Sequence, residues 1–578
     1  MTMARNAFLI VSVVVLAFRN AEAVPKFRPL EDDGYPVVNT NVGSIRGLRA
    51  EDGNYSMFMG IPFAEVDKDN PFGNAIPYPN FEETFDAFDD SAICPQTEEF
   101  NRTIVGTIDC LHVNVYVPDS ASPQNKLPVF VWIFGGGFSF GFPGRFLYGP
   151  SYLVRHDIIF VTLNYRLGPY GFMCLDTPEV PGNQGLKDQV LALRWIRDNI
   201  AAFGGDETKI TIGGNSAGGM AVDFHLHYGK DENLFHKIIP QSGTTVIAGS
   251  VGTGDLTAPL KLAEYFDHTT SDLNDALSFL ATVDPHQLIA ATAETGVFFF
   301  VCVEKEFNNV ENFITTHPVN TKIPRVKDIE VLIGFTNDEM YSGLATVPDI
   351  IFEMSDFVGT SLGINFNFEG EEDLYNEMKE IVTHFYLGDE DINVQLKQEI
   401  IDMTSDFVYN HPILRTVKKY LDNGVENMYL YLFSYSGGRN FAKHRLNLEG
   451  GGATHADELG YLFDIQYMEK PLHPADQLIV DRMTEMWANF VKYGDPTPAP
   501  TELVPVHWPP VTRDKWHYLE LDTEIRVSTR PFQERMAFLD LFYKKNERFQ
   551  RGYEAPSSAR SIVLDISLPL LIALRYFL

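Results

Sequence analysis

The chain has 578 residues, of which 45% are hydrophobic and 13% aromatic. This composition supports a large apolar core and excludes a disordered chain. The formal net charge is −33, from 45 basic and 78 acidic residues. A surface this acidic repels phosphate backbones and anionic membranes, which excludes nucleic-acid binding.

The first residues predict secretion. Arg5 precedes an apolar run over residues 7–18, and Ala21-Glu22-Ala23 has the pattern of a signal-peptidase cleavage site. The run is too short to span a bilayer. We therefore expect residues 1–23 to be a signal peptide and the mature, extracellular chain to begin at Val24.

Secretion permits disulfides and N-linked glycans. Cys94 and Cys110 are close in sequence and flanked by polar loop residues, so they are the expected disulfide. Cys174 and Cys302 lie in apolar surroundings and are expected to be buried free thiols. No CxxC motif or His/Cys cluster indicates a metal site. Two sequons on expected surface loops are candidate glycosylation sites: Asn54 and Asn101.

The mature chain begins with β-rich segments and continues with alternating strands and helices. Residues 127–134 are wholly apolar, which predicts a central strand covered on both faces. Residues 250–330 are expected to be helical and loop-like, with no internal repeat or interdomain linker in the chain. The other expected strands are 111–117, 158–163, 210–212, 234–243, 330–340, 428–435 and 517–521, and the expected helices are 184–202, 475–493 and 531–545. This order predicts an α/β protein with parallel strands and right-handed crossovers.

Ser216 lies in Gly214-Asn215-Ser216-Ala217-Gly218, between a β-branched run and residues with helical spacing. A G-x-S-x-G motif between strand and helix is typical of a nucleophile elbow, which exposes the serine hydroxyl on a sharp turn. A Cβ atom at Gly214 or Gly218 would collide with the neighbouring strand or helix. The alternative is a serine that caps a helix in an αβ turn.

Gly135-Gly136-Gly137-Phe138 directly follows the apolar strand. A dinucleotide-binding turn would need G-x-G-x-x-G opening a helix, but the segment continues with Gly, Pro and Phe, so we discard that interpretation. The motif matches the HGGG-type oxyanion loop of esterases, with Phe134 in place of His. The alternative is a flexible glycine loop.

Taken together, these motifs resemble those of the type-B carboxylesterase/cholinesterase family of α/β-hydrolases. Residues 203–218, FGGDETKITIGGNSAG, fit the family signature at every fixed position, and similarity extends from GIPFA (60–64) to GDP near Gly494. Residues 70–96 and 182–189 resemble secreted insect esterases, particularly those of moth antennae. The resemblance implies the α/β-hydrolase fold, with a large, mostly parallel twisted sheet covered by helices on both faces. It also implies a carboxylic ester hydrolase that needs no cofactor.

The resemblance also assigns a catalytic triad, residue by residue. Ser216 is the nucleophile, Glu339 in Asn337-Asp338-Glu339 is the acid, and His455 in His-Ala-Asp-Glu-Leu is the base. Asp338 and Asp457 are rival acids that only adjacency favours.

The other assigned residues surround this triad. The oxyanion donors are the backbone N–H groups of Gly136, Gly137 and Ala217. Ser242, in Gln-Ser-Gly, is expected to contact Glu339.

Three positions depart from the family pattern. Asn215 replaces the usual Glu before the nucleophile, which keeps a hydrogen-bonding side chain but removes a negative charge. We expect this change to disfavour the imidazolium and to lower turnover. Ile108 replaces an acidic residue and removes a salt bridge, and Met340 replaces Gly after the triad acid.

The substrate is expected to be an uncharged lipophilic ester. Cholinesterases carry a tryptophan in the first cysteine loop that stacks on a quaternary ammonium, and residues 94–110 contain none. Phe138, Phe140 and Phe298 could line an apolar pocket for an odorant, pheromone or plant ester. The alternative places Phe298 to Phe300 in the core.

One domain over residues 24–550 is expected, followed by an apolar tail over 551–578. Ser557-Ser558-Ala559 before the apolar segment resembles a GPI-attachment signal, which would anchor the protein to the cell surface. The alternative is an amphipathic or loosely packed terminus. No obligate protein partner is evident. Two other functions remain open, a slow-turnover carrier of esters or odorants and a non-catalytic adhesion protein.

Overall fold

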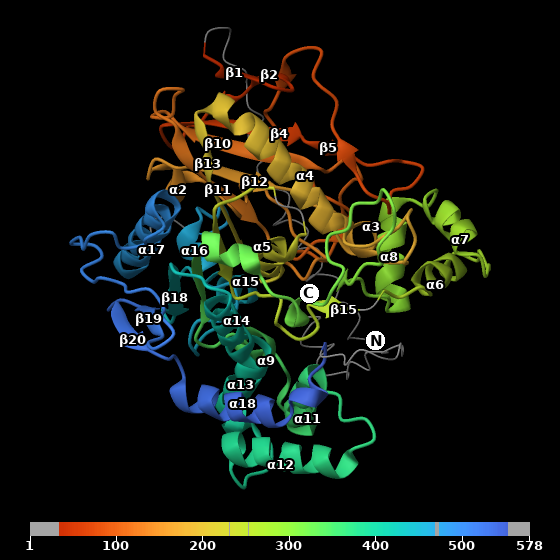
Figure 1. Ribbon diagram of the computed structural model, residues 1–578, viewed down its shortest axis with the longest axis vertical. Helices are drawn as coiled ribbons and strands as arrows, with labels where there is room; N and C mark the ends of the chain where they lie inside the picture. Colours follow the sequence, from red (N-terminus) through yellow and green to blue (C-terminus); the bar gives the residue numbers. More distant parts are fainter. Residues whose placement is uncertain (1–33, 230–231, 253, 469–472, 553–578) are drawn as a thin grey trace, which may run out of the picture.

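An eleven-stranded sheet runs through the centre of the molecule, surrounded by helices (Figure 1). The computed structural model describes residues 34–229, 232–252, 254–468 and 473–552. The predicted signal peptide lies outside the described residues, as does the C-terminal tail beyond residue 552.

The sheet is parallel in its middle and antiparallel at its edges. From one edge to the other its strands are β20 (Arg526–Thr529), β19 (His517–Leu521), β18 (Met428–Phe433), β17 (Glu330–Thr336), β14 (Lys237–Gln241), β13 (Gly205–Asn215), β11 (Leu127–Ile133), β12 (Ile159–Leu163), β10 (His112–Pro118), β4 (Tyr55–Pro62) and β3 (Leu48–Arg49). Strands β19 to β12 in this order pair in parallel. The α/β class predicted from the alternating elements is therefore confirmed.

Shorter strands lie outside this sheet. They are β1 (Val37–Thr40), β2 (Gly43–Arg46) and β7 (Phe85–Asp86) in one small sheet, and the pairs β5 (Ala64–Glu65) with β6 (Ile76–Pro77), β8 (Gln96–Thr97) with β9 (Ile104–Val105), and β15 (Val251–Gly252) with β16 (Val301–Cys302). The pair β8–β9 lies within the loop that Cys94 and Cys110 close. The pair β15–β16 contributes to the cavity described below.

The helices occupy the connections between strands. They are α2 (Ser151–Val154), α3 (Gly168–Phe172), α4 (Gln184–Asn199), α5 (Ala217–His227), α6 (Ala258–Tyr265), α7 (Leu273–Leu280), α8 (Pro285–Thr295), α9 (Tyr341–Ala345), α10 (Asp349–Met354), α11 (Phe357–Asn365), α12 (Glu372–Leu387), α13 (Lys397–Ser405), α14 (His411–Asp422), α15 (Phe441–Leu446), α16 (Leu459–Leu462), α17 (Pro474–Tyr493) and α18 (Gln533–Lys545). Among the described residues, no helix combines the length and apolar character needed to cross a bilayer.

The core explains why β11 is central. Its residues from Val129 to Ile133 are almost completely buried, and the strand lies between β12 and β13 as its unbroken apolar sequence predicts. Helices α4, α5 and α17 pack against β13. Because these strands are parallel, their carboxyl ends and the loops that follow them lie at the same end of the sheet.

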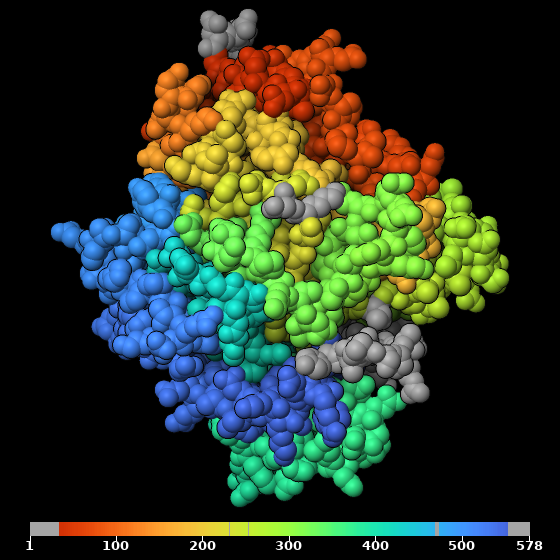
Figure 2. Space-filling view, in the orientation of Figure 1, coloured from red at the N-terminus to blue at the C-terminus, as the bar shows by residue number. Residues whose placement is uncertain are grey.

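Two groups of helices lie away from the sheet. Helices α6, α7 and α8 form one group, and α11, α12 and α18 form another, which appear as separate lobes in the space-filling view (Figures 1 and 2). The sequence prediction assigns no element between residues 341 and 427, where the structure has α9 to α14. A π-helical turn, Asp406–Asn410, joins α13 to α14.

The four cysteines form two disulfides. Cys94 is bonded to Cys110 as predicted. The expectation of free thiols at Cys174 and Cys302 is wrong, because these residues are bonded to each other across 128 positions of sequence. Their apolar surroundings are real, since both are buried, but burial fits a disulfide as well as a thiol. Only the fold places β16 beside the loop that follows α3.

Candidate active site

The strand β13 ends at Asn215 and the helix α5 begins at Ala217, so Ser216 occupies the turn between them. Ser216 has φ 59° and ψ −126°, a backbone conformation that L-residues seldom adopt. Its side chain makes no capping hydrogen bond to α5, which argues against a capping serine. A Cβ atom on Gly218 would lie 2.1 Å from the carbonyl oxygen of Ile133, so only glycine fits there.

Glu339 and His455 meet although 116 residues separate them. The carboxylate Oε2 lies 2.6 Å from His455 Nδ1, and the backbone N–H of His455 donates to the carbonyl oxygen of Glu339 at 3.1 Å. The other carboxylate oxygen accepts hydrogen bonds from Ser242 Oγ at 2.6 Å and from the Thr336 N–H at 2.8 Å. These bonds fix the carboxylate on the imidazole.

The rival carboxylates serve other partners. Asp338 accepts from the backbone N–H of Gly452 at 2.7 Å, and Asp457 accepts from the Thr454 N–H and from Asn440 Nδ2, both at 2.8 Å. Asp457 therefore braces the loop that carries the histidine. Burial raises its pKa to about 6.

The glycine loop after β11 lies directly beside the elbow. A Cβ atom on Gly135 would be 3.1 Å from the Cβ of Ser216, and one on Gly136 would be 2.1 Å from the Phe140 carbonyl oxygen. Gly136 and Gly137 have φ values of 112° and 60°. Within the described residues, the N–H groups of Gly136, Gly137 and Ala217 donate no hydrogen bond. These donors are therefore available to a developing oxyanion.

Ser216 and His455 border one cavity of about 410 Å³. The same cavity is bordered by the three residues with the proposed oxyanion donors, Gly136, Gly137 and Ala217. The structure thus brings together the nucleophile, the base and the oxyanion donors proposed from the sequence. Most other lining residues are apolar: Phe138, Phe140, Met220, Ile247, Phe298, Phe300, Val408, Leu446 and Leu459.

The three phenylalanines named from the sequence all line this cavity. Phe138 and Phe140 are nearly buried, whereas Phe298 is 45% exposed. Phe300 lines the cavity too, and Phe299 between them is buried in the core. Both interpretations of the Phe298–Phe300 run therefore apply, because alternate side chains of an extended segment face opposite ways.

Several lining residues carry no sequence signal. The π-helical turn places Val408 and Tyr409 at the cavity, and the Tyr409 ring packs on the His455 ring with 4.6 Å between centroids. π-helical turns often occur at functional sites, but nothing in the local sequence announces this one. Residues 247–250 approach the cavity from the segment before β15.

One part of the lining is charged. Glu99 and Arg102, in the loop closed by the first disulfide, and Arg445 of α15 border the cavity. Arg445 forms an ion pair with Glu99, and both side chains are largely buried. This part of the lining therefore carries charged groups of both signs.

Asn215, beside the nucleophile, belongs to a buried polar cluster. Its Nδ2 donates to Glu458 Oε1 at 3.1 Å, and Gln241 Nε2 donates to the same oxygen at 3.0 Å. Burial, followed by the negative charge of Glu339, raises the pKa of Glu458 to about 7. A glutamate at position 215 would add another carboxyl here, so the asparagine limits the repulsion between buried acids.

The described residues contain no group of three or more His, Cys, Asp or Glu side chains that could hold a metal ion.

The raised pKa of Glu458 predicts how pH affects stability. The folded protein keeps this proton up to about pH 7, whereas the unfolded chain loses it near 4.5, the ordinary pKa of a glutamate. The proton's contribution to stability is complete below about pH 4.5 and is lost as pH rises through 7. Relative to wild type, Glu458→Gln should gain stability over this window by roughly 3 kcal/mol, at about 1.4 kcal/mol per pKa unit.

Urea unfolding of wild type and Glu458→Gln between pH 4.5 and 8 measures this difference. The exposed Glu82→Gln substitution is the control. Parallel stability curves for wild type and Glu458→Gln would contradict a raised pKa at Glu458.

The model of a family described as "Carboxylesterase family" matches residues 34–539. Juvenile hormone esterase of Tribolium castaneum is 30% identical over 532 residues, covering 86% of this chain and 88% of that protein. Esterase B1 of Culex pipiens is 30% identical over 485 residues, covering 79% and 88%. The crystal structure of juvenile hormone esterase from Manduca sexta, with OTFP covalently attached, has a TM-score of 0.76 at 28% identity, covering 88% of this chain and all of that one.

Proposed function

This chain belongs to the carboxylesterase family and is a carboxylic ester hydrolase, and we propose that it acts through a triad of Ser216, Glu339 and His455. Its α/β-hydrolase fold and its resemblance to insect esterases are confirmed by the same relatives. The observation that carries the proposed triad is the Glu339–His455 hydrogen bond at the cavity that Ser216 also borders.

The geometry supports acyl transfer through a covalent intermediate. His455 accepts the proton of Ser216 as Oγ attacks the ester carbonyl, and then returns it to the departing alcohol. Glu339 holds the imidazole by Nδ1 and stabilises its positive form. Water then attacks the acyl-enzyme by the same route and releases the acid.

The oxyanion donors lower the barrier to each attack. The N–H groups of Gly136, Gly137 and Ala217 are proposed to hold the negative oxygen of the tetrahedral intermediate. Each such donor contributes about 3 kcal/mol in related hydrolases. The α5 helix, which begins at Ala217, adds the positive end of its dipole.

The triad is tested by substituting the nucleophile. Ser216→Ala should lower kcat for 4-nitrophenyl acetate by about 10⁴-fold or more and abolish labelling by an organophosphate. Ser250→Ala removes another serine hydroxyl from the same cavity lining and should keep stoichiometric labelling. Turnover and labelling that survive in Ser216→Ala would refute the proposal. A wild-type protein that binds esters without turnover would instead be a carrier.

The preferred substrates are proposed to be uncharged lipophilic esters, such as odorant, pheromone or plant esters. The lining is mainly apolar and contains no tryptophan among the described residues. A quaternary ammonium binds best to a tryptophan face or to an anion, and the Glu99 carboxylate that borders the cavity is already paired with Arg445. Choline esters therefore fit this cavity poorly.

The substrate proposal predicts an order of rates. Naphthyl acetate and long-chain alkyl acetates should have kcat/KM values at least tenfold above that of acetylthiocholine, because the described lining offers apolar contacts but no tryptophan to hold a quaternary ammonium. A factor of ten corresponds to about 1.4 kcal/mol. Kinetics with the purified protein measure this order. Faster hydrolysis of acetylthiocholine would refute the substrate class.

The protein is further proposed to be secreted and glycosylated, with attachment to the cell surface through its C-terminal signal as a finer step. The cleavage motif before Val24 and the exposed sequons at Asn54 and Asn101 support this location. Protein recovered from the medium of expressing insect cells should begin at Val24 and lose mass on deglycosylation. Release from cells by a phosphatidylinositol-specific lipase would show anchoring. A cell-retained chain beginning at Met1 would contradict secretion.

A further inference from the structure

One wall of the cavity is carried by two segments far apart in sequence, residues 247–250 and residues 298–300. Each segment leads into one strand of the parallel pair β15–β16. This pair is separate from the central sheet. With two residues per strand, it is too short to be stable without contacts to the rest of the protein. The position of the wall must therefore be set by the groups to which the pair is attached.

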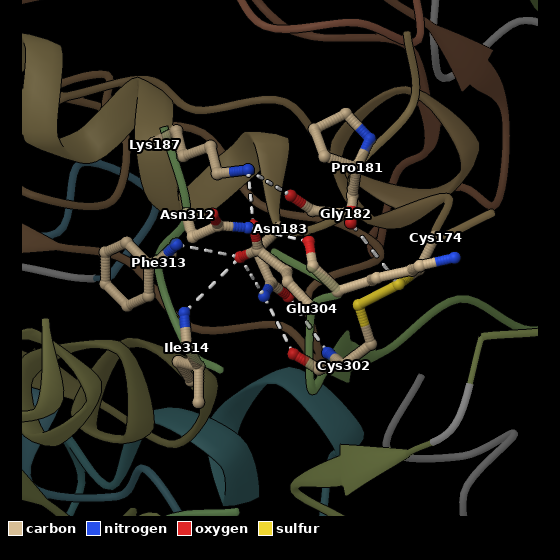
Figure 3. The surroundings of a disulfide bond; sticks show 11 residues. Cys174, Pro181, Gly182, Asn183, Lys187, Cys302, Glu304, Asn312, Phe313 and Ile314 are labelled. Carbon is tan, nitrogen blue, oxygen red and sulfur yellow. Dashed lines mark hydrogen bonds and ion pairs between the residues drawn. A yellow bond between two sulfur atoms is a disulfide. The ribbon is translucent and has the colours of Figure 1, made fainter. Parts of the chain in front are cut away.

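Cys302 of β16 is held by two attachments (Figure 3). Its sulfur is bonded to Cys174 in the loop after α3. Its backbone is held by Asn183, whose Oδ1 accepts from the Cys302 N–H at 2.9 Å and whose Nδ2 donates to the Cys302 carbonyl at 2.8 Å. One amide side chain thus supplies both bonds that a neighbouring strand would supply.

Glu304, two residues further on, extends the attachment to two helices. Its buried carboxylate forms an ion pair with Lys187 of α4 at 2.7 Å and accepts from Asn183 Nδ2, also at 2.7 Å (Figure 3). The same carboxylate accepts from the Phe313 N–H at 3.0 Å, and the Phe313 ring stacks on Tyr228 at the end of α5. The network therefore joins the wall to the helix that begins beside the nucleophile.

The surroundings leave this attachment little freedom. A Cβ atom on Gly182 would lie 2.5 Å from Cys302 Sγ and 2.7 Å from Cys174 Sγ. A Cβ atom on Gly254, just after β15, would lie 2.2 Å from the Cys174 carbonyl oxygen. Packing this close transmits a displacement instead of absorbing it.

We propose that Asn183 and the Cys174–Cys302 disulfide are positioning residues for ester selectivity, which hold Phe298 and Phe300 where their rings limit the size of the ester that reaches the nucleophile. The inference rests on the proposed function, because selectivity has meaning only if the cavity binds the ester. Asn183, Cys174 and Cys302 do not border the cavity, so they act on the fit of the substrate and not on the chemical step.

Asn183→Gly tests the positioning directly. Asn183 has φ 57°, which glycine adopts without strain, so this substitution removes the amide and leaves the backbone conformation allowed. The assay compares the hydrolysis rates of 4-nitrophenyl acetate and 4-nitrophenyl octanoate. Each rate is divided by the concentration of active serine, which is titrated with an organophosphate. The octanoate-to-acetate ratio of kcat/KM should change by about tenfold, mainly through KM, because each methylene in an apolar pocket alters selectivity strongly. The kcat for acetate should stay within about threefold.

Four further variants sharpen the test. The double variant Cys174→Ala/Cys302→Ala should move the ratio in the same direction as Asn183→Gly. Phe298→Ala should move it too, and its combination with Asn183→Gly should be non-additive, because both act through one wall. Asn546→Gly is the matched control: Asn546 is also a buried asparagine at a helix end, with Nδ2 donating to a backbone carbonyl, but it bonds Phe542 and Met378 and not β16.

Ethyl acetate and decyl acetate give the same comparison for the alcohol part of the ester. Asn183→Gly must change either the octanoate-to-acetate ratio or the decyl-to-ethyl ratio of kcat/KM. Wild-type ratios in Asn183→Gly, additive effects with Phe298→Ala, or an equal shift in Asn546→Gly would each overturn the inference. A wild-type protein without a titratable serine would refute the proposed function instead, so the two failures are distinguishable.

Discussion

The contact between Glu339 and His455 is the constraint on which the site depends. The two residues lie in loops separated by 116 positions, yet the carboxylate and the imidazole meet at 2.6 Å inside the protein. The acid follows β17, whose neighbour β18 precedes the long loop region that carries the histidine. The carboxyl ends of parallel strands lie at the same end of the sheet, so both groups lie close together there, as does Ser242 after β14.

The second requirement is close approach of backbone to backbone. Ile133 at the end of β11 pairs with Gly214 near the end of β13, so the glycine loop after one strand is forced beside the elbow after the other. Side chains at Gly135, Gly136 or Gly218 would occupy space already taken by neighbouring atoms. The oxyanion donors and the nucleophile are thus placed by strand register rather than by flexible loops.

Two buried acids near this centre, Glu458 and Glu304, are each matched to a partner or to a proton. Glu458 shares one oxygen between two amide donors and holds its proton near neutral pH. Glu304 is paired with Lys187 and with backbone N–H groups. Unmatched charges at these depths would cost several kcal/mol each. The Asn215 departure from the family pattern is consistent with this arrangement, since it avoids one more carboxyl beside Glu458.

The sequence by itself determined the strands, the elbow at Ser216, the glycine loop and the family, because these depend on local patterns of apolar residues and glycine. It also identified Cys94–Cys110, where the two residues are near neighbours in the chain. The tertiary structure alone decided the pairing of Cys174 with Cys302, the hydrogen bonds between Asn183 and Cys302, and the place of Tyr409 at the cavity. The first two features depend on contacts between segments more than a hundred residues apart and the third on a π-helical turn, and neither leaves a periodic signal in the chain. Helix α14 is different: its buried residues recur at helical spacing, so this local pattern could have predicted it.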